Sequence, residues 1–136
     1  MNTDHFVLSG VKVLVIDDEP EARALTKLVL TLYHADVIAA GNAIEGLEQV
    51  QMHRPDVIVS DIAMPQTDGY QFMRQLRNLP AHNGGQTPAV ALTAFSREED
   101  RTKALDAGFQ GHLSKPFELQ ALIDAIASVT RQLFRN

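Results

Sequence analysis

Acidic residues come directly after two apolar runs of this sequence. Asp17 and Asp18 follow residues 11–16 (V-K-V-L-V-I), and Asp61 follows residues 57–60 (V-I-V-S). Three carboxylates that share one pocket repel each other unless a cation offsets their charge. Oxygen ligands without a nearby His or Cys favour a hard ion, and Mg²⁺ is the usual one where phosphate chemistry follows. With a metal ion bound, one carboxylate can also act as a nucleophile toward phosphorus.

A hydroxyl and an amine come after two further short runs. Thr93 follows residues 89–92 (A-V-A-L), and Lys115 follows residues 111–114. A phosphorylated carboxylate is strongly anionic, and a fixed cation together with a hydroxyl donor stabilises it. Each residue alone has an ordinary explanation, since Asp often caps a helix, Thr favours strands and a loop Lys is usually solvated. Together at one edge of a fold, they favour phosphoryl transfer to an aspartate.

Strands and helices must alternate to bring these residues together. Apolar, β-branched runs predict strands at residues 11–16, 36–40, 57–60, 89–92 and 111–114. Signals for helix starts lie at Pro20, at Asn42 with Glu45, at Asp68 with Gln71, at Ser96 with Glu99, and near Phe117. The pattern predicts an α/β fold of the (βα)5 type, a doubly wound five-stranded parallel sheet that binds ligands at the carboxyl ends of its strands.

Apolar residues at helical spacing support the first and the last of these helices. Leu25, Leu28, Val29 and Leu32 recur along the first helix. A stripe that includes Ile123 and Ile126 runs along the last helix, where it is expected to be core.

Length, charge and composition exclude several classes of protein. The chain has 136 residues, no cysteine and a net charge of −5 at pH 7. This length fits one domain, predicted at residues 10–134 after a lead-in at residues 1–9. The absence of cysteine excludes a disulfide scaffold and a thiolate metal site, and an acidic chain without a basic stripe is a poor binder of nucleic acid. Without a signal peptide or an apolar run of membrane length, a cytoplasmic domain is expected.

The motifs at the strand ends resemble those of the receiver domains of two-component response regulators. The matching segments are V-L-V-I-D-D-E-P (13–20), D-V-I-V-S-D-I-A-M-P-Q-T-D-G-Y (56–70), A-L-T-A (91–94) and S-K-P-F (114–117). They cover nearly the whole chain in the order and spacing of that family. The resemblance implies a flavodoxin-like sheet with the strand order 2-1-3-4-5.

The resemblance also implies roles for the acidic residues. Asp61 is then the phosphoacceptor, and the ligands of Mg²⁺ or Mn²⁺ are Asp17, Asp18, Asp61 and the backbone carbonyl of Ala63. Ala63 and Phe95 occupy the positions that tune the lifetime of the phosphorylated state in this family. Neither side chain offers a polar group that could orient an attacking water, so we expect slow self-dephosphorylation.

Other residues are implied to respond to the phosphoryl group. Thr93 would bond to a phosphoryl oxygen and Lys115 would pair with it, and the Lys115–Pro116 peptide bond is expected to be cis. His112 lies where the family usually has a Tyr or Phe that swings inward on activation. A histidine there can rotate and respond to pH near neutrality. The alternative is a half-buried or exposed ring without a switching role.

The function implied is that of a phosphorylatable receiver, a signalling domain rather than an enzyme. A histidine kinase or histidine phosphotransfer protein donates its phosphoryl group to Asp61, and the domain assists this step and the later dephosphorylation. The conformation then shifts to control a downstream partner or a fused domain. Residues 91–101 and 104–116 look most like receivers of hybrid histidine kinases. A homodimer is a further expectation, whereas direct contact with nucleic acid and membrane insertion are not expected.

Three other functions compete with this interpretation. A small phosphatase with an aspartyl nucleophile usually carries a D-x-D signature, which follows none of the predicted strands. A nucleotide or flavin binding module would call for a G-x-G-x-x-G or Walker loop after the first strand, and neither is present. A degenerate receiver that only docks to a partner loses its main support, because the chain has Asp17, Asp18, Asp61, Thr93 and Lys115.

Overall fold

A computed structural model of the chain describes residues 8–63, 68–94 and 98–130. In these residues one parallel sheet has the strand order β2-β1-β3-β4-β5, which confirms the predicted flavodoxin-like topology. The strands are β1 (Lys12–Ile16), β2 (Asp36–Ala40), β3 (Val57–Asp61), β4 (Ala89–Thr93) and β5 (Gly111–Ser114). The helices are α1 (Pro20–Leu32), α2 (Ala43–His53), α3 (Gly69–Arg77), α4 (Glu98–Ala107) and α5 (Leu119–Thr130), with a short 3₁₀ helix, η2 (Ala81–Asn83), before β4.

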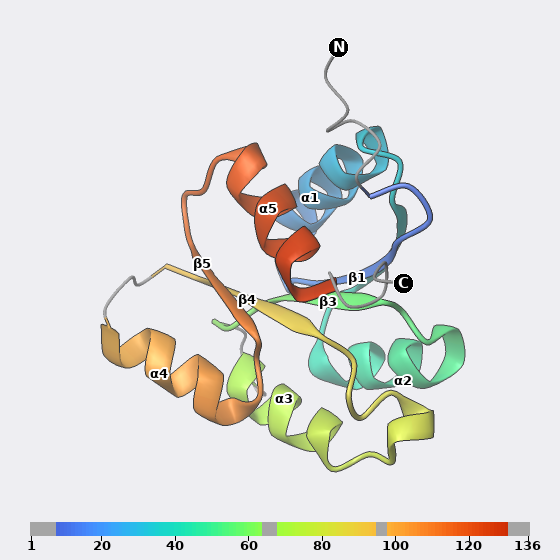
Figure 1. Cartoon of the computed structure of the whole chain (residues 1–136), viewed down its shortest axis with the longest axis vertical. Helices are drawn as coiled ribbons and strands as arrows, with labels where there is room; N and C mark the ends of the chain where they lie inside the picture. The colour runs from blue at the N-terminus through green and yellow to red at the C-terminus, as the bar shows by residue number, and fades with distance from the viewer. Residues whose placement is uncertain (1–7, 64–67, 95–97, 131–136) are drawn as a thin grey trace.

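Helices cover both faces of the sheet. α1 and α5 lie on one face, and α2, α3 and α4 lie on the other (Figure 1). Alternate residues of each strand therefore enter two separate cores. Val13 and Val15 pack with Leu30 and α5, whereas Leu14 and Ile16 pack on the side of α2 and α3. This two-sided burial explains why the central strands read as nearly continuous apolar runs.

The strand ends differ slightly from the predicted ones. Asp61 and Thr93 are the last residues of β3 and β4 rather than the first residues after them. In the register of the sheet, Asp61 lies opposite Leu92, and Thr93 lies opposite Ser114. The backbones of both residues therefore belong to the paired strands at the carboxyl edge of the sheet.

The helix starts follow the predicted capping signals where the structure describes them. The side chain of Asn42 accepts a hydrogen bond from the backbone N–H of Glu45, and Asp68 forms a reciprocal capping box with Gln71. Ser96 lies outside the described residues. α5 begins at Leu119 rather than near Phe117, a shift that is common at helix ends.

The predicted lead-in at residues 1–9 is described only from Leu8 onward. Leu8 is completely buried and packs in the same core as Val11. The backbone N–H of Val11 donates to the carbonyl oxygen of Leu8 at 2.9 Å. The chain is therefore anchored to the core one turn before β1, and the domain boundary at residue 10 remains a prediction.

The apolar stripe of α1 faces away from the core. Its leucines, Leu25, Leu28 and Leu32, are 61%, 57% and 63% exposed, whereas Val29 is half-buried and Leu30 is buried. Helical spacing correctly predicted the helix, but the buried side of α1 is the one that carries Leu30. Within the described residues no helix has both the length and the apolar character needed to cross a membrane.

Candidate functional site

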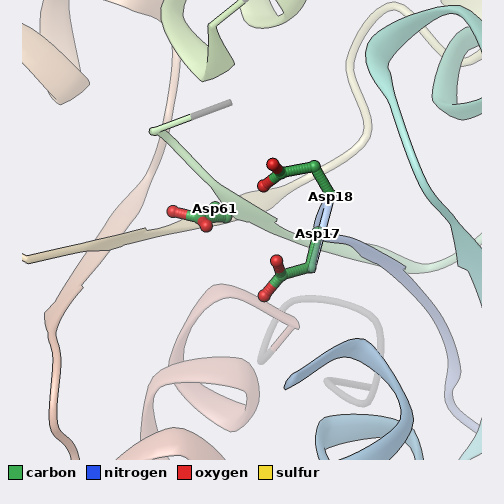
Figure 2. A group of neighbouring side chains, drawn as sticks. All are labelled: Asp17, Asp18 and Asp61. Atoms are coloured by element: carbon green, nitrogen blue, oxygen red, sulfur yellow. The ribbon is translucent and has the colours of Figure 1, made fainter. Parts of the chain in front are cut away.

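Three carboxylates meet at the carboxyl edge of the sheet. Asp17 and Asp18 follow β1, and Asp61 ends the neighbouring strand β3 (Figure 2). One carboxylate oxygen from each residue lies within 4.8 Å of the corresponding oxygens of the other two. The sequence predicted this convergence, and it results from the pairing of β1 with β3.

Asp17 is the most buried of the three acids, with 2% of its surface exposed. Its Oδ1 accepts a hydrogen bond from the backbone N–H of Glu19 at 2.9 Å. Burial raises the pKa of Asp17, and the nearby charges of Asp61 and Asp18 raise it further, while the Glu19 hydrogen bond and Lys115 act in the opposite direction. The site therefore holds a carboxylate whose ionised form is costly in the absence of a cation.

Lys115 brings a positive charge to the cluster. Its Nζ lies 3.2 Å from Oδ2 of Asp61 and 3.9 Å from Oδ2 of Asp17. The backbone N–H of Lys115 donates to the carbonyl oxygen of Thr93 at 2.7 Å, and the Lys115–Pro116 peptide bond is cis. Lys115 thus connects the end of β5 with the end of β4 and with the acids.

The backbone around Asp61 is tightly packed. Oδ1 of Asp61 accepts a hydrogen bond from the backbone N–H of Ala63 at 3.1 Å, and the N–H of Gly69 donates to the carbonyl of Ile62 at 2.8 Å. A Cβ atom at Gly69 would lie 2.7 Å from Cα of Ile62 and 2.8 Å from the carbonyl oxygen of Asp61. Glycine is needed there so that α3 can start against the end of β3. The assignment of the Ala63 carbonyl to a metal ion remains a prediction.

The other residues singled out from the sequence differ in their surroundings. Thr93 is 4% exposed at the end of β4, on the same edge as Asp61. Phe95 lies outside the described residues. The roles predicted for these two residues in phosphoryl binding and lifetime remain predictions.

His112 is half-buried in β5. It lies opposite Ala91, whose side of the sheet is covered by α3 and α4. Its Nε2 is buried and has no hydrogen-bond partner among the described residues. Burial lowers the pKa of the His112 imidazole. The charge of Asp100 on α4 raises this pKa, whereas the charge of Arg101 lowers it, and the net shift favours the neutral ring. Its role as a switch remains a prediction.

One contact at the site was not predicted from the sequence. Nη1 of Arg23 donates a hydrogen bond to the backbone carbonyl of Asp17 at 2.8 Å. Because Arg23 lies near the start of α1, it comes only six positions after Asp17 in the sequence. The contact could have been anticipated from the sequence, because an arginine in the first turns of a helix lies close to the end of the strand that precedes the helix.

Comparison with known proteins identifies the family. The profile of the response regulator receiver domain matches residues 13–127. The chain belongs to this family. Receiver domains are signalling domains of two-component systems.

Relatives of this receiver domain differ in how much of their length it covers. An uncharacterized 14.6 kDa protein of Leptolyngbya boryana is 42% identical over 116 residues, which cover 85% of this chain and 87% of that protein. The response regulator MprA of Mycobacterium ulcerans is 34% identical over 123 residues, which cover 90% of this chain but only 51% of MprA. The receiver domain therefore spans about half the length of MprA.

A solved structure is similar to this receiver domain in fold and carries a metal ion. It is the receiver domain of the sensor histidine kinase PA1611 of Pseudomonas aeruginosa, described with magnesium coordinated in its active-site cleft. The two are 27% identical, with a TM-score of 0.79 over 89% of this chain and 98% of that one. The acidic pocket of this receiver domain fits such an ion, because its clustered side chains present only oxygen ligands.

Replacing Asp17 with Asn is expected to stabilise the metal-free receiver domain by roughly 1 kcal/mol, or about 3–6 °C in Tm. The pKa of Asp17 is raised in the folded state, so its ionised form lowers stability at pH values above that raised pKa. Asn keeps an oxygen that can accept the Glu19 hydrogen bond. Thermal unfolding with and without Mg²⁺ measures the effect, and Mg²⁺ should raise the Tm of the wild type much more than that of Asp17→Asn.

The exposed Asp106→Asn on α4 is the matched control for this experiment. It should leave both melting temperatures within about 1 °C of wild type, as expected for a surface substitution. A lower Tm for Asp17→Asn than for wild type in the absence of Mg²⁺ would show that ionised Asp17 does not strain the fold.

An apolar hollow adjoins the acidic pocket of the receiver domain. A cavity of about 440 Å³ is lined at one end by Asp17 and Lys115 and beyond them mostly by apolar side chains, including Leu25 and Phe117. A second cavity of about 180 Å³ continues it along α1 and α5. Leu25 lines both cavities, and the groove that they form reaches Asp17 and Lys115.

Proposed function

We propose that this receiver domain accepts a phosphoryl group from a phosphohistidine onto Asp61 in a Mg²⁺-dependent reaction, and that the modification controls a downstream protein or a fused domain. The observation that carries the proposal is the position of Asp61 within 4.8 Å of two further carboxylates and 3.2 Å from Lys115. Three acids with a nearby lysine are the residue types that a metal-assisted phosphoryl transfer to a carboxylate requires.

In the proposed reaction, Asp61 displaces the histidine of the donor protein from the phosphorus atom. A carboxylate oxygen of Asp61 forms a bond to phosphorus, the bond between phosphorus and the donor's imidazole nitrogen breaks, and that nitrogen keeps the electron pair. Bound Mg²⁺ would offset the charge of the acids and of the phosphoryl oxygens. Lys115, already 3.2 Å from Asp61, can transfer its ion pair to a phosphoryl oxygen, and the Thr93 hydroxyl can donate to another.

A small acyl phosphate provides the first test. The chain is incubated with this donor and either Mg²⁺ or a chelator, and its intact mass is measured. We expect uptake of one phosphoryl group with Mg²⁺ and none with the chelator. If neither the small donor nor a phosphorylated histidine kinase modifies a chain that binds Mg²⁺, phosphoryl transfer is excluded and a docking role remains.

The donor protein is proposed to be a histidine kinase or a histidine phosphotransfer protein that contacts the exposed face of α1. Leu25, Leu28 and Leu32 present exposed apolar surface, and Leu25 also lines the groove that reaches Asp17 and Lys115. Contiguous apolar surface of this kind is typical of protein interfaces. A helix placed there could bring its histidine to the acidic pocket.

Leu28→Glu is expected to slow transfer from a phosphorylated histidine kinase by roughly 10-fold or more, since burying an unpaired charge in an interface costs at least 1.4 kcal/mol. The same variant should react with the small acyl phosphate at the wild-type rate, because Leu28 is exposed on α1 and does not line either cavity. Leu105→Glu is the matched control, since Leu105 is an exposed leucine of α4. Equal losses with the small donor and the kinase would mean that Leu28→Glu acts on the site rather than on docking.

A further inference from the structure

The backbone of Asp17 is held from two sides. Its N–H donates to the carbonyl oxygen of Ala40 at the end of β2, at 3.2 Å. Its carbonyl oxygen accepts a hydrogen bond from Nη1 of Arg23 at 2.8 Å. That carbonyl belongs to the peptide group that joins Asp17 to Asp18, so its orientation affects the direction of both side chains.

The loop after β2 leaves room for the guanidinium of Arg23. A Cβ atom at Gly41 would lie 3.0 Å from Nη1 of Arg23 and 3.7 Å from Oε2 of Glu45. The same Oε2 accepts a hydrogen bond from the backbone N–H of Gly41 at 2.9 Å. A side chain at this position would require the guanidinium of Arg23 to shift slightly.

Two physical effects of Arg23 on a bound cation have opposite signs. As a positive charge near three carboxylates, Arg23 opposes the binding of a second cation. As a hydrogen-bond donor to the Asp17–Asp18 peptide group, it holds two of the acids in place and lowers the cost of ordering them. Partners that orient metal ligands typically change metal affinity by roughly 10- to 100-fold.

We infer that Arg23 is a positioning residue for the divalent cation, which fixes Asp17 and Asp18 through their shared peptide group and thereby strengthens cation binding despite its own positive charge. This inference rests on the proposed binding of Mg²⁺ by the three acids. Within the described part of the chain, Arg23 makes its hydrogen bond to the backbone carbonyl of Asp17 rather than to a carboxylate oxygen, so it acts through Asp17. Gly41 in the loop after β2 leaves space for the guanidinium of Arg23, and Glu45 of α2 holds the backbone N–H of Gly41.

Calorimetric titration with Mg²⁺ at fixed pH and ionic strength tests the inference on the full chain. Arg23→Met should weaken the Kd roughly 10-fold, and Arg23→Lys, which keeps the charge and one donor, should recover part of the loss. Gly41→Ala should also weaken binding, because its Cβ would require Nη1 of Arg23 to shift while no charge changes. Arg74→Met, at an exposed arginine of α3, should leave the Kd within about twofold of wild type.

The sign of the change for Arg23→Met decides between positioning and charge repulsion. Mg²⁺ binding as tight as wild type, or tighter, would overturn the inference while leaving the proposed function intact. A wild-type chain that does not bind Mg²⁺ would overturn both. If Arg23→Met does not fold, as judged by circular dichroism, Gly41→Ala decides the question by the same Kd measurement, and an unchanged Kd there overturns the inference.

Discussion

Asp61→Asn is expected to remove all detectable uptake of a phosphoryl group, from the small acyl phosphate and from a phosphohistidine donor alike. An amide oxygen is a much weaker nucleophile than a carboxylate oxygen. Asn is also neutral, so it attracts the bound Mg²⁺ less strongly than an ionised Asp does. The shape of the side chain is kept, and its oxygen can still accept the hydrogen bond from Ala63 that Oδ1 of Asp61 accepts at 3.1 Å. Loss of reaction would therefore come from chemistry rather than from unfolding.

Intact mass spectrometry and a melting curve together measure this effect. Asp106→Asn, an exposed aspartate of α4, should take up the phosphoryl group as the wild type does. Asp61→Asn should keep a cooperative melting transition. A phosphorylated Asp61→Asn chain would assign the acceptor role to another carboxylate, and Asp18, which shares the cluster, would be the first to examine.

Arg77→Met is expected to cost about 3 kcal/mol of unfolding free energy, a large share of the stability of a domain of this size. Nη1 of Arg77 donates to the carbonyls of Gly85 and Thr87 at 3.0 and 2.7 Å. Nη2 donates to the carbonyl of Gly108 at 2.7 Å and to Oε1 of Gln110 at 3.1 Å. One guanidinium thus joins the end of α3, the loop before β4 and the turn before β5. Without it these acceptors lose their partner in a part-buried place, where unsatisfied polar groups are costly.

Urea unfolding at pH 7 gives the free-energy change for Arg77→Met. Arg77→Lys should recover only part of the loss, because an ammonium cannot reach all of these acceptors as the planar guanidinium does. Arg74→Met, an exposed position on the same helix, should change the free energy by less than about 0.5 kcal/mol. A cost below about 1 kcal/mol for Arg77→Met would show that water replaces the arginine at its acceptors.

Local patterns in the sequence were sufficient for the elements and for much of the site. A central strand such as residues 57–60 has a neighbouring strand on each side and helices on both faces of the sheet. Nearly every residue of such a strand must therefore be apolar, and this pattern can be recognised in the sequence alone. The caps at Asn42 and Asp68 were also predictable, because a cap is an interaction between residues three positions apart. In the same way, polar residues at strand ends must share one edge once the strands are known to be parallel.

The face of α1 shows where periodicity stops being informative. Leu25, Leu28 and Leu32 repeat as a core stripe would, yet they lie outside, and α1 packs through the side that carries Leu30. Hydrophobic spacing reports that a helix has an apolar face, but it does not say whether that face meets the sheet or a partner. Only the packing of α1 against the sheet decides this.

The sequence by itself determined the order of strands and helices, the residue types at the carboxyl edge and the resemblance to receiver domains, because these depend on spacing along the chain. Only the tertiary structure decided the contacts between residues far apart in the chain, or between a side chain and a backbone group that carries no sequence signal. The five hydrogen bonds of Arg77 all end on residues 8 to 33 positions away. The contact of Arg23 with the Asp17 carbonyl likewise depends on the angle at which α1 leaves β1. Backbone carbonyls are the same in every residue, so their partners are specified by three-dimensional position alone.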